Sequence, residues 1–161
     1  MRILGIDPGY AIVGFGILDY NGIDFTPIEY GAVITEAGTP FPQRLSCINE
    51  DIEYIFNKFK PDCMAIERLY FTSNQKTAID VAQARGVTVL SAAKRNVPVY
   101  EYTPLQVKQS VAGYGRAGKN QIQQMIKTIF HMDKIIKPDD AADAVAIAVC
   151  HAFSCRFAQR V

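Results

Sequence analysis

Apolar and polar positions along the first 35 residues follow the short period that is typical of β-strands. An apolar run at 2–7 ends in an acid and a Pro-Gly turn pair, and a second run at 11–20 is too rich in glycine for a helix. An Asn-Gly pair, the strongest short signal for a hairpin, leads into a third run at 23–35. The sequence therefore predicts three antiparallel strands at the start of the fold.

The period then changes to that of a helix. Apolar side chains recur on one helical face until Pro61 stops the helix, at Leu45, Ile48, Ile52, Ile55, Phe56 and Phe59. A short buried strand at 62–67 ends in Glu67. The rest of the chain predicts helices at about 77–95, 103–112, 119–130 and 139–155, with a strand at 97–102 and a flexible glycine-containing loop at 113–118.

The predicted order of elements is βββ-α-β-α-β-α-α-α, without an internal repeat or linker. We therefore expect one α/β domain over 1–161, with a five-stranded mixed sheet flanked by helices. A strand–helix–strand crossover makes the first and fourth strands parallel. Asp7 and Glu67 end these two strands, so both carboxylates should emerge at the sheet edge where open α/β sheets place their ligands.

Two further acids open the last predicted helix. Asp140 and Asp143 are three residues apart and share one helical face. If this helix packs beside the first strand, four carboxylates converge, and they cannot all stay ionised in a dry site. Magnesium resolves this conflict because it is a hard ion with oxygen ligands, and two such ions about 4 Å apart catalyse phosphodiester hydrolysis.

Each acid also has a simpler interpretation. Asp7 could shape the turn that follows it, and Glu67 could form an ion pair with Arg68. Asp139 is better placed as an N-cap of the last helix than as a ligand. Because Asp139 and Asp143 are also a permitted i, i+4 pair, the spacing alone leaves the choice between Asp139 and Asp140 open.

Composition limits the class of protein. With 49% hydrophobic and 20% charged residues the chain is typical of a globular protein, and no apolar run is long enough to span a membrane. The acid at position 7 excludes a signal-peptide core, so we expect a cytoplasmic protein. The four cysteines lack a C-x-x-C pair and predict reduced thiols, and the isolated His131 and His151 predict structural or surface roles.

Charge is distributed unevenly along the chain. Residues 1–67 hold four basic and ten acidic side chains, a balance of −6, whereas residues 68–138 hold eleven basic and three acidic ones, a balance of +8. Residues 139–161 add two basic and three acidic side chains, which gives the net charge of +1. The central block indicates either contacts with nucleic-acid phosphates or simply solvated helix faces.

Several of these segments resemble, in order and at compatible spacing, the RuvC family of bacterial Holliday junction resolvases. The resemblance extends over nearly the whole chain, and the segments that carry it are Ile3-Leu4-Gly5-Ile6-Asp7-Pro8-Gly9, Gly14-Phe15-Gly16, Ala65-Ile66-Glu67, Ala82-Gln83-Ala84-Arg85-Gly86, Gln106-Val107-Lys108-Gln109, Lys119 and Asp140-Ala141-Ala142-Asp143-Ala144. The first segment alone would be weak evidence for this family, since actin-like and sugar-kinase ATPases use a similar phosphate loop.

The resemblance implies a ribonuclease-H-like fold and symmetric nicking of four-way junction DNA by a homodimer, with the RuvA–RuvB branch-migration complex as a partner. It implies a metal site for Mg²⁺, with two ions per site and Mn²⁺ able to substitute. The catalytic and metal-binding residues it implies are Asp7, Glu67, Asp140 and Asp143.

The family's aromatic residue three positions after the glutamate corresponds to Tyr70, and Phe71 follows it, so which ring stacks at the junction stays open. Family lysines for catalysis and phosphate contact correspond to Lys108 and Lys119. With the central basic block, the predicted DNA-binding residues are Arg68, Tyr70, Phe71, Lys76, Arg85, Lys108, Arg116 and Lys119.

Two other functions compete with a junction resolvase: a ribonuclease-H-like nuclease that acts on RNA, and a binding module or fragment of an actin-like ATPase. An actin-like ATPase needs two such domains and a second phosphate loop, which 161 residues do not contain. For the homodimer we expect the helix at 77–95 to form the interface, unless the sheet buries it, because its apolar side chains exceed one core face: Ala78, Ile79, Val81, Ala82, Val87 and Leu90.

Overall fold

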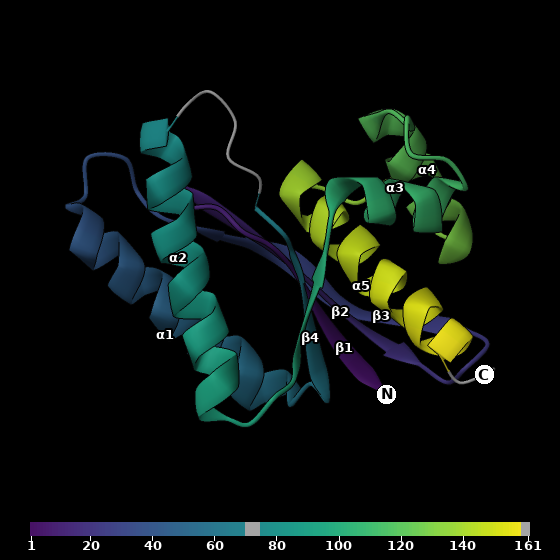
Figure 1. Ribbon diagram of the computed structural model, residues 1–161, viewed down its shortest axis with the longest axis horizontal. Coiled ribbons are helices and arrows are strands. Elements are labelled where there is room, and N and C mark those ends of the chain that lie inside the picture. The colour runs from purple at the N-terminus through teal and green to yellow at the C-terminus, as the bar shows by residue number, and fades with distance from the viewer. Residues whose placement is uncertain (70–74, 159–161) are drawn as a thin grey trace.

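The computed structural model describes the backbone of residues 1–69 and 75–158 and the side chains of 1–69 and 77–155. Five strands form one sheet in the order β3-β2-β1-β4-β5 (Figure 1). The elements are β1 (Arg2–Asp7), β2 (Ile12–Tyr20), β3 (Phe25–Ile34), α1 (Phe41–Phe59), β4 (Cys63–Glu67), α2 (Gln75–Lys94), β5 (Val99–Tyr102), α3 (Pro104–Ala112), α4 (Lys119–Ile129) and α5 (Asp139–Ala158).

The sheet is mixed, as predicted. Strands β1, β2 and β3 are antiparallel neighbours, and β4 is parallel to β1 on one side and to β5 on the other. The hairpin after β2 differs from the prediction, since β3 begins at Phe25 rather than at 23. The Asn21 side chain accepts hydrogen bonds from the backbone N–H groups of Ile23 and Asp24, at 2.9 and 2.8 Å, and so forms a wider turn.

Helices cover both faces of the sheet (Figure 1). Helices α1 and α2 lie on one face, and α5 lies on the other with α3 and α4 packed against it. Along β1, Ile3 points into the core under α5, whereas Leu4 and Ile6 point into the core under α1 and α2. Both faces of the central strand are therefore buried, which fixes its register.

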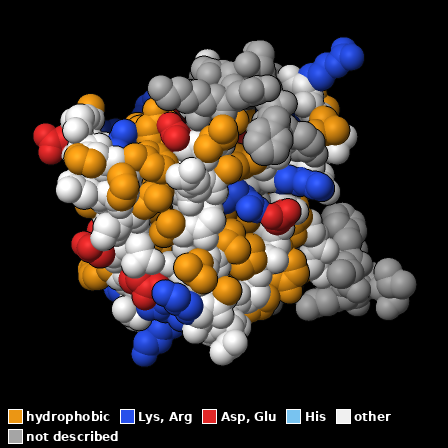
Figure 2. All heavy atoms as spheres, turned by 60° about the vertical axis from the view of Figure 1, so that its left-hand side comes forward, with side chains coloured by type: hydrophobic (Ala, Val, Ile, Leu, Met, Phe, Trp, Pro, Cys, Tyr) orange, Lys and Arg blue, Asp and Glu red, His pale blue; other side chains and the backbone are white. Residues whose placement is uncertain are grey.

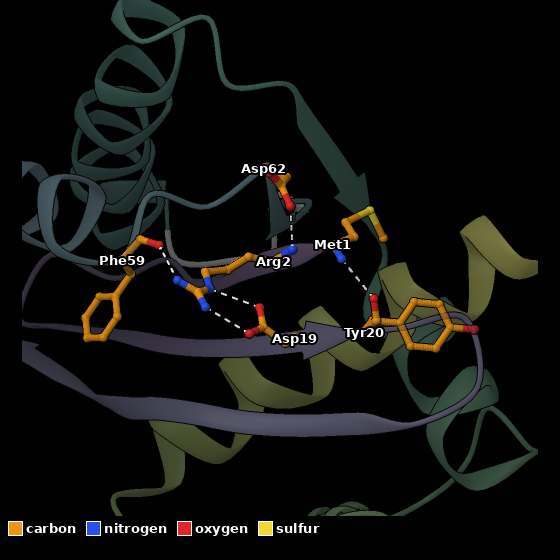
Figure 3. Close-up of polar contacts among 6 residues, drawn as sticks. All are labelled: Met1, Arg2, Asp19, Tyr20, Phe59 and Asp62. Atoms are coloured by element: carbon orange, nitrogen blue, oxygen red, sulfur yellow. Dashed lines mark hydrogen bonds and ion pairs between the residues drawn. The ribbon is translucent and has the colours of Figure 1, made fainter.

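An arginine network anchors the end of the sheet where β1 begins (Figure 3). The Arg2 guanidinium donates to both carboxylate oxygens of Asp19, at 2.9 and 2.8 Å, and to the Phe59 carbonyl at the end of α1, at 2.9 Å. The Asp62 carboxylate accepts from the Arg2 backbone N–H at 2.6 Å, and the Met1 amine donates to the Tyr20 carbonyl at 2.9 Å. These contacts join β1 to β2, α1 and the start of β4.

Helix α2 has two different faces. Ala84, Thr88 and Ala92 are buried toward the core. Ile79 and Leu90 are 54% and 51% exposed, and a Cβ added at Gly86 would meet no atom within 4 Å. The exposed face is free within the subunit to form the predicted interface, but Val87 packs against the core instead.

No helix in the described part of the chain is both long enough and apolar enough to cross a membrane.

Candidate active site

The central strands place two of the predicted acids beside each other. Ile6 and Ile66 are paired in the parallel β1–β4 ladder, so Asp7 and Glu67 follow at adjacent strand ends. On the other side of β1, Asp7 pairs with Gly14 of β2. The expectation that these carboxylates emerge at one sheet edge is confirmed.

Glycines on β1 and β2 let α5 approach this edge closely. A Cβ on Gly14 would lie 2.0 Å from the backbone oxygen of Asp140, and a Cβ on Gly5 would lie 2.1 Å from that of Ala144. A Cβ on Gly16 would lie 2.5 Å from the Cγ2 atom of Val145. Because Gly14 is also the partner of Asp7, the first turn of α5 lies directly beside the end of β1.

Two acids of the resulting cluster, Asp7 and Glu67, have raised pKa values. Burial raises the pKa of Asp7 from 3.8 to about 7, and the negative charges of Glu67, Asp143 and Asp140 contribute to this rise, whereas Lys119 opposes it. Burial also raises the pKa of Glu67, with a contribution from Asp143, and the nearby Lys108 opposes this. All four predicted acids therefore interact electrostatically around Asp7.

A groove of about 250 Å³ lies beside the cluster. Its charged walls are Glu67, Asp143, Lys108 and Lys119, and its apolar walls come from α3, α4 and α5. Lys119 lies 3.1 Å from the Asp143 carboxylate and 3.6 Å from that of Asp139. Burial lowers the pKa of Lys119, but these two carboxylates outweigh it and the net shift is upward.

Asp139 does not have the predicted role of an N-cap. It is the first residue of α5, and its carboxylate accepts from the Gln123 side chain at 3.0 Å and from Lys137 at 2.6 Å. The hydrogen bond from Lys137 lowers the pKa of Asp139 most, and the hydrogen bond from Gln123 lowers it further. Its carboxylate is therefore held by side chains of α4 and of the preceding loop, whereas Asp140 influences Asp7.

The ion pair considered for Glu67 and Arg68 is not present among the described residues, and Arg68 is exposed. Arg85 is instead paired with Glu101, and its Nε lies 3.5 Å from the Glu67 carbonyl oxygen. Arg116 is exposed. The predicted contacts of Tyr70, Phe71 and Lys76 lie outside the described side chains.

Within the side chains that the structure describes, no three His, Cys, Asp or Glu residues are arranged to hold a metal ion. The four cysteines are free thiols, as predicted. His151 is buried and its Nδ1 lies 2.7 Å from the Tyr102 hydroxyl, and His131 is exposed, so both occupy structural or surface positions.

Sequence reasoning missed two features of the site. Gln123 is buried next to the apolar face of α4, and a polar residue at such a position is a signal that it has a partner. Gly14 and Gly16 alternate on one face of β2, and this spacing is a signal for the close approach of another element.

Comparison with known proteins identifies the family. The model of the family described as "Crossover junction endodeoxyribonuclease RuvC" matches residues 3–151. The chain belongs to the RuvC family. A relative of that name from Alkaliphilus oremlandii is 53% identical over 99% of this chain and 97% of its own.

Solved RuvC structures have the same fold. The Thermus thermophilus RuvC structure superposes with a TM-score of 0.90 at 32% identity, covering 98% of this chain and 97% of the other. The T. thermophilus protein in complex with a Holliday junction substrate gives 0.93 at 33% identity, covering 98% and 96%. The predicted ribonuclease-H-like fold is therefore confirmed.

Proposed function

We propose that this chain is a structure-specific DNA endonuclease that resolves four-way junctions by nicking two opposed strands. The observation that carries the proposal is the convergence of Asp7, Glu67, Asp140 and Asp143 beside a groove that also contains Lys108 and Lys119. The RuvC relatives, one of them solved with a Holliday junction, support the choice of substrate.

The residues of the groove divide into two roles. Lys108 and Lys119 would contact the scissile phosphate and stabilise the negative charge that develops on it during hydrolysis. The carboxylates would orient the attacking water and accept its proton. Apolar walls formed by Val107, Ile122 and Ala146 would limit the access of other water molecules.

We further propose a divalent metal, Mg²⁺ in the first place and two ions per site, with Mn²⁺ able to substitute. The repulsion that raises the pKa of Asp7 supports this, because a cation would relieve it. Mg²⁺ usually takes only one or two protein carboxylates together with waters and phosphate oxygens, so a site for it does not need three acids around one ion. Asp7, Glu67, Asp140 and Asp143 would hold the ions between them. When bound, such ions supply an activated water and stabilise the leaving oxygen.

Three parts of the proposal concern the setting of the enzyme. The active form would be a homodimer, because two opposed cuts need two sites and a two-fold substrate is matched by two identical subunits. The RuvA–RuvB branch-migration complex would be its partner, and the cytoplasm its location. Membership of the family supports these three parts, and the chemistry of one site does not need them.

The test is cleavage of a synthetic four-way junction with magnesium. We expect Asp7→Asn, Glu67→Gln and Asp140→Asn each to abolish cleavage while junction binding survives, because the amides keep the shape but lose the charge. Asp24→Asn, an exposed acid in the β2–β3 turn, is the matched control. Near wild-type nicking by two of the three site variants would show that the assignment is wrong.

The same assay separates the competing functions. Cleavage of RNA in preference to the junction would favour the alternative ribonuclease-H-like nuclease. A Lys108→Ala, Lys119→Ala double variant should lose both affinity and cleavage rate. Its binding should also depend less on salt, by roughly 0.9 in log–log slope for each phosphate that the protein no longer neutralises. Unchanged affinity and turnover in this variant would refute the role of the two lysines.

A further inference from the structure

A second hollow lies between α3 and α4, beyond the groove. It measures about 330 Å³ and is lined by an aromatic ring, a thioether, a methyl group and three amides: Ala112, Tyr114, Asn120, Gln121, Gln124 and Met125. Tyr114 is 47% exposed and Met125 39% exposed, so neither side chain is explained by the core.

Two glycines shape the backbone around Tyr114. Gly113 ends α3 in the left-handed conformation, with a φ of 82°, and its N–H donates to the Gln109 carbonyl. Gly115 lies so close to α3 that a Cβ there would be 2.2 Å from Cδ1 of Leu105. Glycines on both sides therefore shape the backbone that carries the ring.

The hollow and the groove lie on different faces of α4, and both use the first turns of that helix. Lys119 lines the groove, and Asn120 and Gln121, the next two residues, line the hollow. At about 3.6 residues per turn, Gln121 and Gln124 lie on the side of α4 away from Lys119, so the hollow is across the helix from the groove. Arg116, an exposed cation, lies in the loop between Tyr114 and α4.

These features match the chemistry of a nucleotide. An exposed aromatic ring offers a face for stacking, amide side chains can bond to base edges, and neighbouring cations attract phosphates. Gln121 is already oriented, because its Oε1 accepts from the Gly118 N–H at 2.8 Å. The residues that line the hollow are uncharged, which favours a base over a phosphate inside the hollow itself.

We propose that this hollow receives one unstacked base of the DNA substrate, stacked on Tyr114, while the strand runs across the start of α4 to the groove. The inference rests on the proposed function and adds a subsite to it. The hollow would make cleavage sensitive to the identity of one nucleotide near the cut, through Asn120, Gln121 and Gln124.

The experiment combines protein variants with junctions that lack a single base. Each junction carries one abasic site at a different position within about three nucleotides of the cut, and affinity and single-turnover cleavage are measured for each. For the wild type we expect one position at which loss of the base weakens binding about tenfold, within the range that base–aromatic stacking supports.

Tyr114→Ala should bind the intact junction about tenfold more weakly than the wild type does. Removing the sensitive base from the junction should not weaken the binding of this variant any further. Tyr114→Phe should behave as the wild type, and Gln124→Leu should lose discrimination between bases at that position. Tyr54→Ala is the matched control, since Tyr54 is 58% exposed on α1. Thermal melting of each variant confirms that it is folded.

The proposal is overturned if the abasic and Tyr114→Ala effects add, or if Tyr114→Ala matches the wild type on every junction. In the second case the hollow would be a surface for a protein partner or would have no ligand. Failure of the wild type to cut intact junctions would contradict the proposed function instead. Efficient cutting with no sensitive position contradicts only the subsite.

Discussion

Asp7 is the carboxyl on which the repulsion from the other acids of the site acts. Burial and three neighbouring acids bring its pKa to about 7, so at neutral pH the metal-free protein holds Asp7 partly protonated. Lys119 only partly compensates, because it is itself paired with Asp143 and Asp139. The carboxylates of such a site repel each other when no cation is present, and a bound cation would relieve this repulsion.

Asp7→Asn should stabilise the metal-free protein at alkaline pH. A carboxyl whose pKa is higher in the folded state binds more protons there, so stability falls as pH rises from about 4 to about 7. At pH 8 the amide removes this cost, and we expect the free energy of unfolding to increase by on the order of 1–3 kcal/mol.

Denaturant unfolding at pH 4 and pH 8 with a chelator measures this effect, with Asp24→Asn as the exposed control. The gain should be present at pH 8 and nearly absent at pH 4. An equal gain at both pH values would contradict the link to titration of Asp7. Added magnesium should stabilise the wild type more than the variant, since ligands that bind the folded state stabilise it.

The register at the start of α5 gives a second prediction at this scale. Asp140→Asn should abolish cleavage, and Asp143→Asn should reduce it strongly. Asp139→Asn should reduce cleavage by less than about tenfold, because the Asp139 carboxylate is held by Gln123 and Lys137. Equal losses for Asp139→Asn and Asp140→Asn in one cleavage assay would show that the register is wrong.

At this scale the sequence predicted the acids but not their surroundings. Asp7 and Glu67 could be found because strand ends and parallel crossovers determine where they emerge. The hydrogen bond of Asp139 with Gln123 joins residues that are 16 positions apart, on two helices whose packing no local pattern encodes. The N-cap interpretation of Asp139 was wrong because α5 already includes Asp139, and the first helical hydrogen bonds, from the N–H groups of Ala141 and Ala142, end on the Pro138 carbonyl.

Helix α5 is the element on which the site depends most. Its first turn carries two of the four acids. Its close packing on the sheet depends on the absence of side chains at Gly5, Gly14 and Gly16. Local periodicity predicted all five helices of the described residues, because it needs only neighbours in the chain. It did not predict how near α5 lies to β1 and β2, which depends on shape complementarity between distant segments.

Gly14→Ala should therefore affect both stability and cleavage. The added Cβ would meet the Asp140 backbone oxygen at 2.0 Å, so α5 must move away from the end of β1. Overpacking of this kind costs typically 1–3 kcal/mol, and the displaced Asp140 should lower cleavage at least tenfold. Thermal unfolding and junction cleavage together measure the two effects.

Gly118→Ala is the control for stability. Gly118 has a φ of −76°, which any residue adopts, and an added Cβ there would lie 3.7 Å from its nearest neighbour. Its cost should stay below about 1 kcal/mol. A Gly14→Ala variant as stable and as active as the wild type would show that the close packing of α5 on β2 does not position Asp140.

At the scale of the whole molecule, the two sides of the sheet differ in character. The groove and the second hollow lie on the side of α3, α4 and α5. Figure 2 brings the opposite side forward, with α1 and α2, and shows hydrophobic side chains spread over that face with charged ones among and around them. The surface suited to a second subunit is therefore distinct from the groove proposed for catalysis.

The outer face of α2 is the part of this surface that we expect to pair with a second copy of the chain. Exposed Ile79 and Leu90 are 11 residues apart, or about three helical turns. Ala82 and Gly86 lie between them, and such small residues let two helices approach closely. The inner face, with Ala84 and Ala92, is buried within the subunit, so only the outer one can contribute to an interface.

Ile79→Glu should shift the protein toward monomer, because dimerisation would bury an unpaired charge. Sedimentation at micromolar concentration should show a dimer for the wild type and at least a tenfold weaker dimer for the variant. Ile23→Glu, a 73% exposed isoleucine in the β2–β3 turn, should remain dimeric. On junctions, the Ile79→Glu monomer should make single rather than paired nicks, since its own acids are intact. A wild-type chain that sediments as a monomer and makes paired nicks without dimerising on DNA would rule out this interface.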